Sequence, residues 1–303
     1  MARGGGERVG YSAGVSSPIA TTLAALIERY DGFLLDAYGV LVDQAGACAG
    51  ARDALARLRA AARTLMVVTN DTSRLPATIE RRFASVGLAI AAGEVVTPGL
   101  LLPEHVRERG LAGARALVLG NDDACAYARA AGLDVLDAAQ AIAAERRGAP
   151  AAIDALVICD DGGFEFLPGM NAALSACVRT LDEGRPLALV LTNPDLVYPR
   201  GGGALGFTAG TMARMLEGAL RRRHPGAPPF EVLGKPNPAL FELGRARLPR
   251  ATRVVMIGDS LETDVAGARA AGIDVALLTG VSVWRDGAAP PERAPTWLLH
   301  ALA

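Results

Sequence analysis

The chain has 303 residues, enough for about two domains of common size. Hydrophobic residues make up 51% and charged residues 21%, an ordinary globular mixture, and the formal net charge is −1. This charge argues against nucleic acid as the main partner, because binding a phosphate backbone needs a basic surface. No apolar run reaches the roughly 18 residues of a membrane span, and the N-terminal segment lacks the apolar stretch of a secretory signal. We therefore expect a cytoplasmic protein with neither a membrane nor a nucleic-acid partner.

Short apolar segments alternate with amphipathic segments along most of the chain. The short apolar runs have the length of buried strands, and the longer segments repeat their apolar residues at helical spacing. In chain order, the pattern predicts a helix at 19–30, a strand at 32–39, a helix at 51–64, a strand at 65–70, a helix at 76–87, a strand at 116–122, a helix ending at 131, strands at 133–136 and 155–161, a helix at 168–183, a strand at 187–193, a helix at 208–220, a strand at 253–260, a helix at 262–271 and a strand at 273–278. Such alternation predicts parallel α/β sheets.

Several of the predicted strands end in acidic or small polar residues. Asp36 ends the first, Thr69 and Asn70 end the second, and Asp259 and Ser260 end the strand at 253–260. In open parallel sheets, ligands bind beyond the carboxyl ends of the strands, so these residues are expected to converge on one site. Each type is also common in turns and helix caps, so the prediction depends on the combination.

The basic residues have an unusual composition. Of the 31 residues that are Lys or Arg, only Lys235 is a lysine. Arginine replaces lysine well on a solvated surface, but not where a site needs a compact point charge. This favours a Lys235 that meets a phosphate or a carboxylate in a tight pocket; the alternative is a surface lysine retained by chance.

Four segments resemble, in order, the four motifs of the haloacid dehalogenase superfamily. They are LLDAYGVLVD (34–43), VVTNDTSR (67–74), GKPNPALFE (234–242) and MIGDSLETDVAGARAAGI (256–273). The last two are similar to the class IIA branch, which is NagD-like and nitrophenylphosphatase-like, and TNPDLVYP (192–199) resembles the cap loop of that branch. The resemblance covers roughly residues 32–282.

The resemblance implies an α/β fold with two parts. Residues 1–98 and 214–303 would form a doubly wound parallel-sheet, Rossmann-like core, and residues 99–213 would form an inserted α/β cap domain. A cap that closes over the core excludes water and supplies specificity. Members of the branch are often dimers through the cap, so a homodimer of this kind is expected.

The resemblance also assigns catalytic roles. Asp36 would be the nucleophile that forms an aspartyl-phosphate, and Lys235 would neutralise charge on the nucleophile and the phosphoryl oxygens. Thr69, Asn70 and Asp71 would bind the transferring phosphate. The ligand would be a small phosphorylated metabolite.

A magnesium ion is implied as the cofactor. Asp36, Asp259, Asp264 and the backbone carbonyl of Tyr38 would hold it, because Mg²⁺ prefers an all-oxygen site completed by water and phosphate. In the cap, three side chains would face the substrate: Asn193, Asp195 and Tyr198. An ordinary turn at 193–195 is the alternative for the first two.

The first motif departs from the phosphatase pattern at Tyr38. Phosphatases of the superfamily usually carry a second aspartate there, which protonates the leaving group and then activates water. DAYG resembles instead the first motif of 2-haloacid dehalogenases, and phosphonatases also lack that aspartate. Three hypotheses follow: a phosphohydrolase with altered acid–base chemistry, favoured by Asp259 and Asp264; an enzyme that cleaves carbon–halogen or carbon–phosphorus bonds; and a catalytically weak or inactive phosphometabolite-binding protein.

Overall fold

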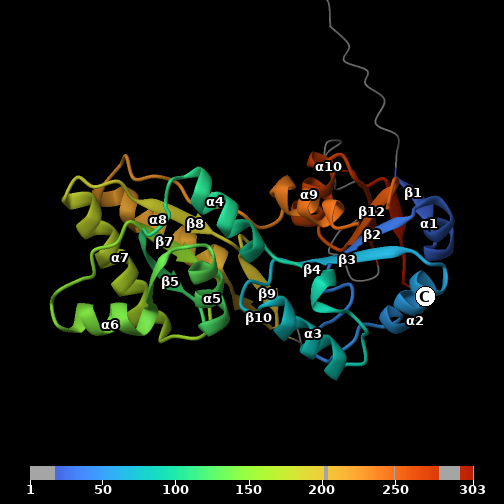
Figure 1. The fold of residues 1–303 in the computed structure, drawn as a ribbon, viewed down its shortest axis with the longest axis horizontal. Helices are drawn as coiled ribbons and strands as arrows, with labels where there is room; N and C mark the ends of the chain where they lie inside the picture. Colours follow the sequence, from blue (N-terminus) through green and yellow to red (C-terminus); the bar gives the residue numbers. More distant parts are fainter. Residues whose placement is uncertain (1–17, 201–203, 249, 280–293, 303) are drawn as a thin grey trace, which may run out of the picture.

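The computed structural model describes residues 18–200, 204–248, 250–279 and 294–302. They form two lobes, each built on its own sheet (Figure 1). Helices cover both faces of each sheet, and two short stretches of chain join the lobes. Within the described ranges, no helix combines the length and the apolar character needed to cross a bilayer.

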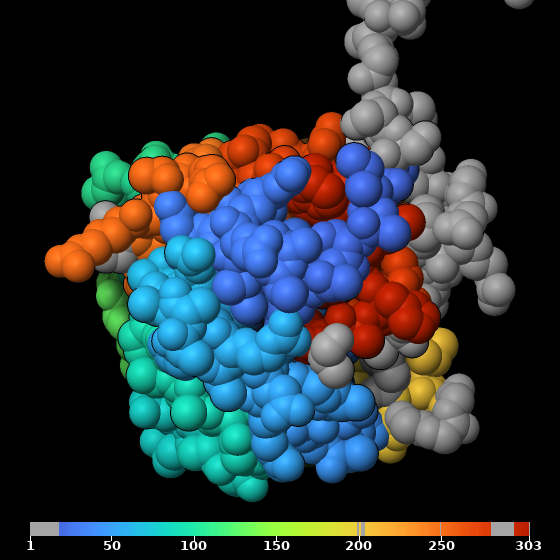
Figure 2. All heavy atoms as spheres, turned by 90° about the vertical axis from the view of Figure 1, so that its right-hand side faces the viewer, coloured from blue at the N-terminus to red at the C-terminus, as the bar shows by residue number. Residues whose placement is uncertain are grey.

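The lobe that contains the first and last described residues is built on the core sheet, in which the described residues provide seven strands, all parallel. In spatial order they are β1 (Ile19–Thr21), β14 (Trp297–Leu299), β13 (Asp274–Leu278), β12 (Val254–Gly258), β2 (Gly32–Leu35), β3 (Thr64–Val68) and β4 (Val95–Val96). Figure 2 shows the blue N-terminal and red C-terminal segments side by side on the outer face of this lobe. The doubly wound parallel core is therefore confirmed.

Side chains of the core sheet alternate between two hydrophobic layers. On β2, Phe33 and Leu35 point to one layer and Leu34 to the other, as the two-residue period of a strand requires. The first layer is covered by α1 (Leu23–Arg29), α2 (Ala51–Ala60) and α3 (Pro76–Ser85), and the second by α9 (Pro238–Ala246) and α10 (Ala266–Ala270). With both faces covered, the strands are nearly continuous apolar runs.

The second lobe is built on the cap sheet, to which the described residues contribute five parallel strands. In spatial order they are β11 (Glu231–Val232), β8 (Ala188–Leu191), β7 (Ala155–Ile158), β5 (Arg115–Leu119) and β6 (Asp134–Asp137). Its helices are α6 (Ala138–Arg146), α7 (Phe166–Asp182) and α8 (Ala209–Arg223) on one face, and α4 (Leu102–Glu108) and α5 (Asp122–Ala130) on the other. An antiparallel hairpin, β9 (Val197–Pro199) with β10 (Leu205–Phe207), precedes α8.

The predicted division at residue 214 falls inside α8. Ala213, Leu216 and Leu220 of this helix pack in one hydrophobic cluster with strands of the cap sheet. The next strand, β11, pairs with β8 at the edge of the same sheet. The chain therefore stays with the cap sheet as far as Val232, and the cap segment extends past the expected boundary.

The predicted helix at 19–30 is wrong at its start. Ile19–Thr21 form β1, which pairs with β14, and the helix begins only at Leu23. Thr22 separates the two elements: its backbone is extended and its hydroxyl accepts a hydrogen bond from the Ala25 amide at 3.2 Å. The strand depends on a partner more than 270 positions away, which a local pattern does not reveal.

The cap helix α5 is hydrogen-bonded to the core loop that follows β3. The Tyr127 hydroxyl donates to the Arg74 carbonyl at 2.9 Å and shares a hydrogen bond with the Thr97 hydroxyl at 2.8 Å. Asn121, the N-cap of α5, donates to the Ser73 carbonyl at 2.8 Å. These contacts hold the core loop that follows β3 against the cap.

Tyr127→Phe is expected to lower the free energy of unfolding by about 1–3 kcal/mol, because it leaves buried polar groups without a partner. A urea titration with an unchanged slope measures this difference. Tyr198→Phe, on the half-exposed hairpin, is the matched control, with an expected change within about 0.5 kcal/mol. Equal midpoints for Tyr127→Phe and the wild type would contradict a stabilising role for this contact.

Candidate active site

Three neighbouring core strands deliver polar side chains to one edge of the sheet. Asp36 follows β2, Thr69 and Asn70 follow β3, and Asp259 follows β12, which lies beside β2. The Asp36 amide still donates to the Ile257 carbonyl at 2.9 Å, so the backbone of Asp36 is held by the sheet itself. The convergence expected from the strand ends is therefore present in the fold.

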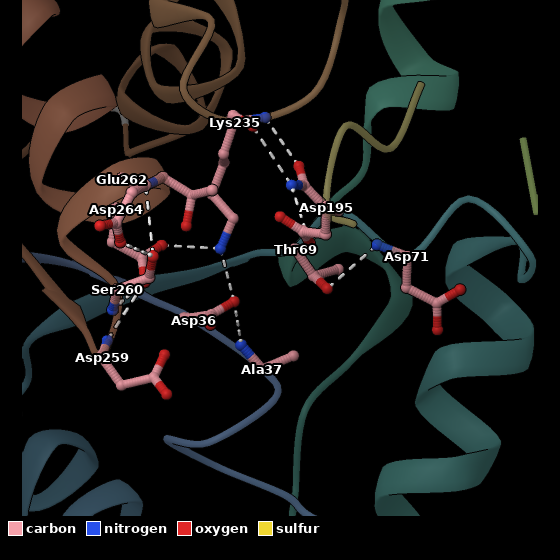
Figure 3. A network of polar contacts seen from close by, with 12 residues as sticks. Asp36, Ala37, Thr69, Asp71, Asp195, Lys235, Asp259, Ser260, Glu262 and Asp264 are labelled. Carbon is pink, nitrogen blue, oxygen red and sulfur yellow. Dashed lines mark hydrogen bonds and ion pairs between the residues drawn. The ribbon is translucent and has the colours of Figure 1, made fainter. Parts of the chain in front are cut away.

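Lys235 is buried at the centre of this edge. Its Nζ lies 2.6 Å from Asp36 Oδ1 and 2.7 Å from Asp264 Oδ1, and only 3% of the residue is exposed (Figure 3). An ammonium group with so little contact with water needs carboxylate partners. The lysine expected from composition to sit in a tight pocket does so, with two carboxylates around it.

Asp264 is completely buried and uses both carboxylate oxygens. Oδ1 pairs with Lys235, and Oδ2 accepts the amides of Asp259 and Ser260 at 3.1 and 3.2 Å. A single π-helical turn, η3 (Leu261–Val265), replaces the start of the helix predicted at 262–271 and carries this residue. At Gly258, an added Cβ would lie 2.4 Å from Asp264, so only glycine leaves room for the carboxylate.

The carboxylates of the site repel one another in a region with little water. Burial raises the pKa of Asp36 well above its usual range, Lys235 offsets part of that rise, and Asp264 adds to it. Burial and then Asp264 raise the pKa of Asp259 to about 7. Burial opposes the charge on Lys235, but Asp264 and Asp36 raise its pKa, so the ammonium stays protonated at neutral pH. The single positive charge of Lys235 does not balance the negative charges of the carboxylates around it.

The donor set fits a hard divalent cation. Asp36, Asp259 and Asp264 each offer a carboxylate oxygen, and these oxygens lie within 4.8 Å of one another. The backbone of Gly39 packs against the Asp259 carboxylate. Its φ is +90°, and an added Cβ would lie 2.3 Å from Asp259 Oδ2. An all-oxygen cradle with excess negative charge is the kind of site that Mg²⁺ binds.

The residues expected to bind phosphate divide into two groups. Thr69 and Asn70 are buried beside Lys235; Thr69 Oγ1 accepts the Asp71 amide at 3.2 Å and keeps its own proton available for donation. The Asp71 carboxylate turns away from Asp36 (Figure 3) and instead accepts from Ser73 and pairs with Arg74 at 2.7 Å. Asp71 therefore shapes the loop.

The three cap residues expected to face the substrate make different contacts. Asn193 Oδ1 accepts the Asp195 amide at 3.0 Å, an ordinary turn contact, while Asp195 Oδ2 accepts from Asn70 Nδ2 at 3.3 Å. Tyr198 is on β9, and its ring covers Gly206 of the paired strand. Of these three side chains, that of Asp195 is the one that is hydrogen-bonded to a residue of the core site, Asn70.

Tyr38 lies between the catalytic edge and α3. The Arg82 guanidinium is 5.4 Å from the centre of the Tyr38 ring, and Arg82 Nη2 is 3.4 Å from the phenolic oxygen. Sequence analysis did not single out Arg82, because it is one of many arginines and no local pattern distinguishes it. Its position is the clearest addition that the structure makes to the site.

Family models match both ends of the chain. A model described as haloacid dehalogenase-like hydrolase covers residues 33–134, and one described as HAD-hydrolase-like covers residues 232–303. The chain is 30% identical over 275 residues to the glycerol-3-phosphate phosphatase of Gallus gallus, spanning 88% of this chain and 85% of the relative. The chain belongs to the haloacid dehalogenase-like hydrolases. Human chronophin is also 30% identical, over 86% of this chain and 85% of its own length.

Solved structures of this superfamily have the same architecture. A possible sugar phosphatase from Cytophaga hutchinsonii matches with a TM-score of 0.74 and 24% identity over 94% of this chain and 98% of its own. The magnesium complex of a glycerol phosphate phosphatase from Mycobacterium tuberculosis matches with a TM-score of 0.72 and 25% identity over 93% and 77%. Escherichia coli NagD matches with a TM-score of 0.68 and 19% identity over 90% and 96%. These neighbours therefore share the fold of this haloacid dehalogenase-like hydrolase, in which a parallel-sheet core carries a second α/β lobe.

Lys235→Arg is expected to abolish most turnover although the charge is conserved. The pocket that holds Nζ between two carboxylates has no room for a larger planar guanidinium, and overpacking a buried site costs about 1–3 kcal/mol of stability. Phosphate-release kinetics and a urea titration measure the two effects. Arg107→Lys, on an exposed surface, is the control, with both properties unchanged. Wild-type kinetics in Lys235→Arg would contradict the need for a compact charge.

Proposed function

We propose that this protein is a magnesium-dependent phosphatase that hydrolyses a small phosphorylated metabolite through an aspartyl-phosphate on Asp36. One observation carries the proposal: the Lys235 ammonium is buried between Asp36 and Asp264, with Asp259 close by. This combination gives a nucleophile, a fixed positive charge and a cation site at one sheet edge. Preorganised charges of this kind stabilise the transition state of phosphoryl transfer.

The hydrogen bonds on Asp36 indicate which oxygen attacks. Oδ1 accepts from Lys235 Nζ at 2.6 Å and from the Ala37 amide at 2.7 Å. These contacts hold the carboxylate still and leave Oδ2 to attack phosphorus. The P–O ester bond breaks as the O–P bond to Asp36 forms, and the leaving alkoxide takes a proton from water and departs as the alcohol. A second water then cleaves the aspartyl-phosphate, which releases inorganic phosphate and restores the Asp36 carboxylate.

Asp36, Asp259, Asp264 and the Tyr38 carbonyl would hold Mg²⁺. When bound, the cation would supply positive charge to the phosphoryl oxygens. Lys235 adds its charge on the same side, and Thr69 donates its hydroxyl proton to a phosphoryl oxygen. Asn70 contributes chiefly by holding Lys235, since its side chain already bonds both backbone groups of the lysine.

The two other reaction types find less support. A metal-independent dehalogenase has no use for the clustered Asp259 and Asp264. A phosphonatase would use a neutral lysine amine to form a Schiff base, whereas Asp264 and Asp36 raise the pKa of Lys235 and keep it protonated. A protein that only binds a phosphometabolite would retain the same pocket, and the turnover experiment below separates it from an enzyme.

We further propose that the leaving group is a small polyol. Relatives of this chain are named as glycerol-3-phosphate phosphatases. On the cap, Asp160 lies close enough to Asp71 and Arg74 for their charges to affect one another, and burial followed by Asp161 raises its pKa to about 6. If the leaving group contacts this cap segment, its carboxylates would accept hydrogen bonds from hydroxyls and would disfavour a leaving group that carries a carboxylate or a second phosphate. The homodimer through the cap and the cytoplasmic location stay predictions.

Asp36→Asn is expected to abolish phosphate release, because an amide oxygen does not act as the nucleophile. Wild-type protein should release phosphate from glycerol 3-phosphate and from p-nitrophenyl phosphate with Mg²⁺ and lose this activity with EDTA. A circular-dichroism melt of the variant shows that the fold is intact. Undiminished turnover by Asp36→Asn would refute the nucleophile, and wild-type binding of phosphate without turnover would support the binding-protein hypothesis.

Tyr38→Asp is expected to increase turnover of alkyl phosphates, since a general acid contributes about 10²–10⁴-fold when the leaving group is poor. The gain should be smaller for p-nitrophenyl phosphate, whose leaving group needs little protonation. Tyr38→Phe is the matched control, because it removes the hydroxyl and its Arg82 contact without adding an acid. Equal rates for the wild type and Tyr38→Asp on both substrates would show that the missing acid does not limit the reaction.

A further inference from the structure

The cap loop at 193–195 reaches the catalytic edge through one side chain. Asp195 Oδ2 accepts a hydrogen bond from Asn70 Nδ2 at 3.3 Å. The same Nδ2 donates to the Lys235 carbonyl at 3.3 Å, and Asn70 Oδ1 accepts the Lys235 amide at 2.7 Å. Asn70 thus holds the backbone of the catalytic lysine on both sides, and the cap carboxylate holds Asn70.

Asp195 is itself held rigidly by the cap. Its amide donates to Asn193 Oδ1 at 3.0 Å, and its carbonyl accepts from the Gly210 amide at 3.1 Å and from the Thr208 hydroxyl at 2.5 Å. Gly210 lies in the first turn of α8, and an added Cβ there would lie 2.4 Å from the Asp195 carbonyl oxygen. The carboxylate therefore moves with α8 and the cap sheet.

The chain that leads into Lys235 is also part of the cap. β11 pairs with β8, and the Leu233 amide continues the ladder by donating to the Leu191 carbonyl at 2.9 Å. An added Cβ at Gly234 would lie 2.3 Å from the Thr192 carbonyl oxygen and 2.7 Å from Asn70 Oδ1. The catalytic lysine thus follows directly after the cap sheet, in close contact with the loop that carries Asp195.

We propose that Asp195 is a positioning residue that acts through Asn70 to set the place of Lys235. The carboxylate accepts only from the NH₂ side of the Asn70 amide, so it fixes Nδ2 toward the Lys235 carbonyl and Oδ1 toward the Lys235 amide. If the Asn70 amide were reversed, its oxygen would face the Lys235 carbonyl and the Asp195 carboxylate, and its NH₂ group would face the Lys235 N–H. The seating of the cap on the core thereby determines whether the Lys235 ammonium reaches Asp36. The inference rests on the proposed phosphatase function only for its kinetic consequence.

The kinetic test compares Asp195→Ala with Asp195→Asn on p-nitrophenyl phosphate. Losing a hydrogen bond to a charged group predicts a fall in kcat of about tenfold to 100-fold for Asp195→Ala, with KM within about twofold because no substrate contact is lost. Asp195→Asn should recover most of kcat, since its carbonyl oxygen still accepts from Asn70. A rise in KM at unchanged kcat would overturn the proposal and make Asp195 a substrate-binding residue.

The single lysine of the chain gives a measurement that does not depend on turnover. Tag-free protein labelled with ¹³C,¹⁵N-lysine should give one set of lysine signals, all from Lys235. Asp195→Ala is expected to shift the Lys235 amide and side-chain signals and to speed exchange of that amide with solvent, while Asp195→Asn leaves them near the wild-type positions. Unshifted signals in Asp195→Ala would overturn the proposal even if activity fell.

Asp123 provides the matched control. It is a cap carboxylate that also bonds the core, accepting from the Leu75 amide at 2.9 Å and the Thr78 hydroxyl at 2.7 Å, without touching Asn70. Asp123→Ala is expected to lower stability and to leave the Lys235 signals and kcat unchanged. If it shifted them as much as Asp195→Ala does, the effect would belong to cap docking in general, and the specific route through Asn70 would be refuted. If the wild-type protein showed no turnover, the proposed function would be refuted. The lysine signals would still test whether Asp195 positions Lys235.

Discussion

A buried ammonium group needs carboxylates around it, and much of this structure follows from satisfying Lys235. Its two ion pairs, to Asp36 and Asp264, lie where almost no water reaches. Removing one partner from such an arrangement leaves an uncompensated buried charge, which is strongly destabilising. The glycine at 258, the π-helical turn and the loop after β2 all leave space for these carboxylates. The catalytic edge is thus an electrostatic unit that the sheet holds together.

The same unit explains why a cation site belongs to this edge. Asp36 and Asp264 share the lysine, but Asp259 lies next to them without a full partner, and burial raises its pKa to about 7. A divalent cation held by Asp36, Asp259 and Asp264 would add the missing positive charge. The excess negative charge at this edge therefore favours a hard divalent cation.

The cap is connected to this unit by more than the chain itself. Tyr127 and Asn121 fix the loop after β3, and Asp195 contacts Asn70 from the other side. Lys235 directly follows the segment that pairs with the cap sheet. A change in how the cap sits would therefore reach Asp36 through a few hydrogen bonds. This gives a physical basis for coupling closure over the substrate to catalytic readiness.

The sequence by itself determined the alternation of strands and helices, the polar strand ends, and the importance of its single lysine. These depend on short-range patterns and on composition, and the structure places Asp36, Thr69 and Lys235 at one edge of the core sheet. The tertiary structure decided the edge strand at 19–21, the attachment of α8 to the cap sheet, and the contacts of Arg82 and Asp195. Each of these depends on partners far away in the chain. Side-chain chemistry can be inferred locally, but which oxygen meets which nitrogen is fixed only when the sheets pack.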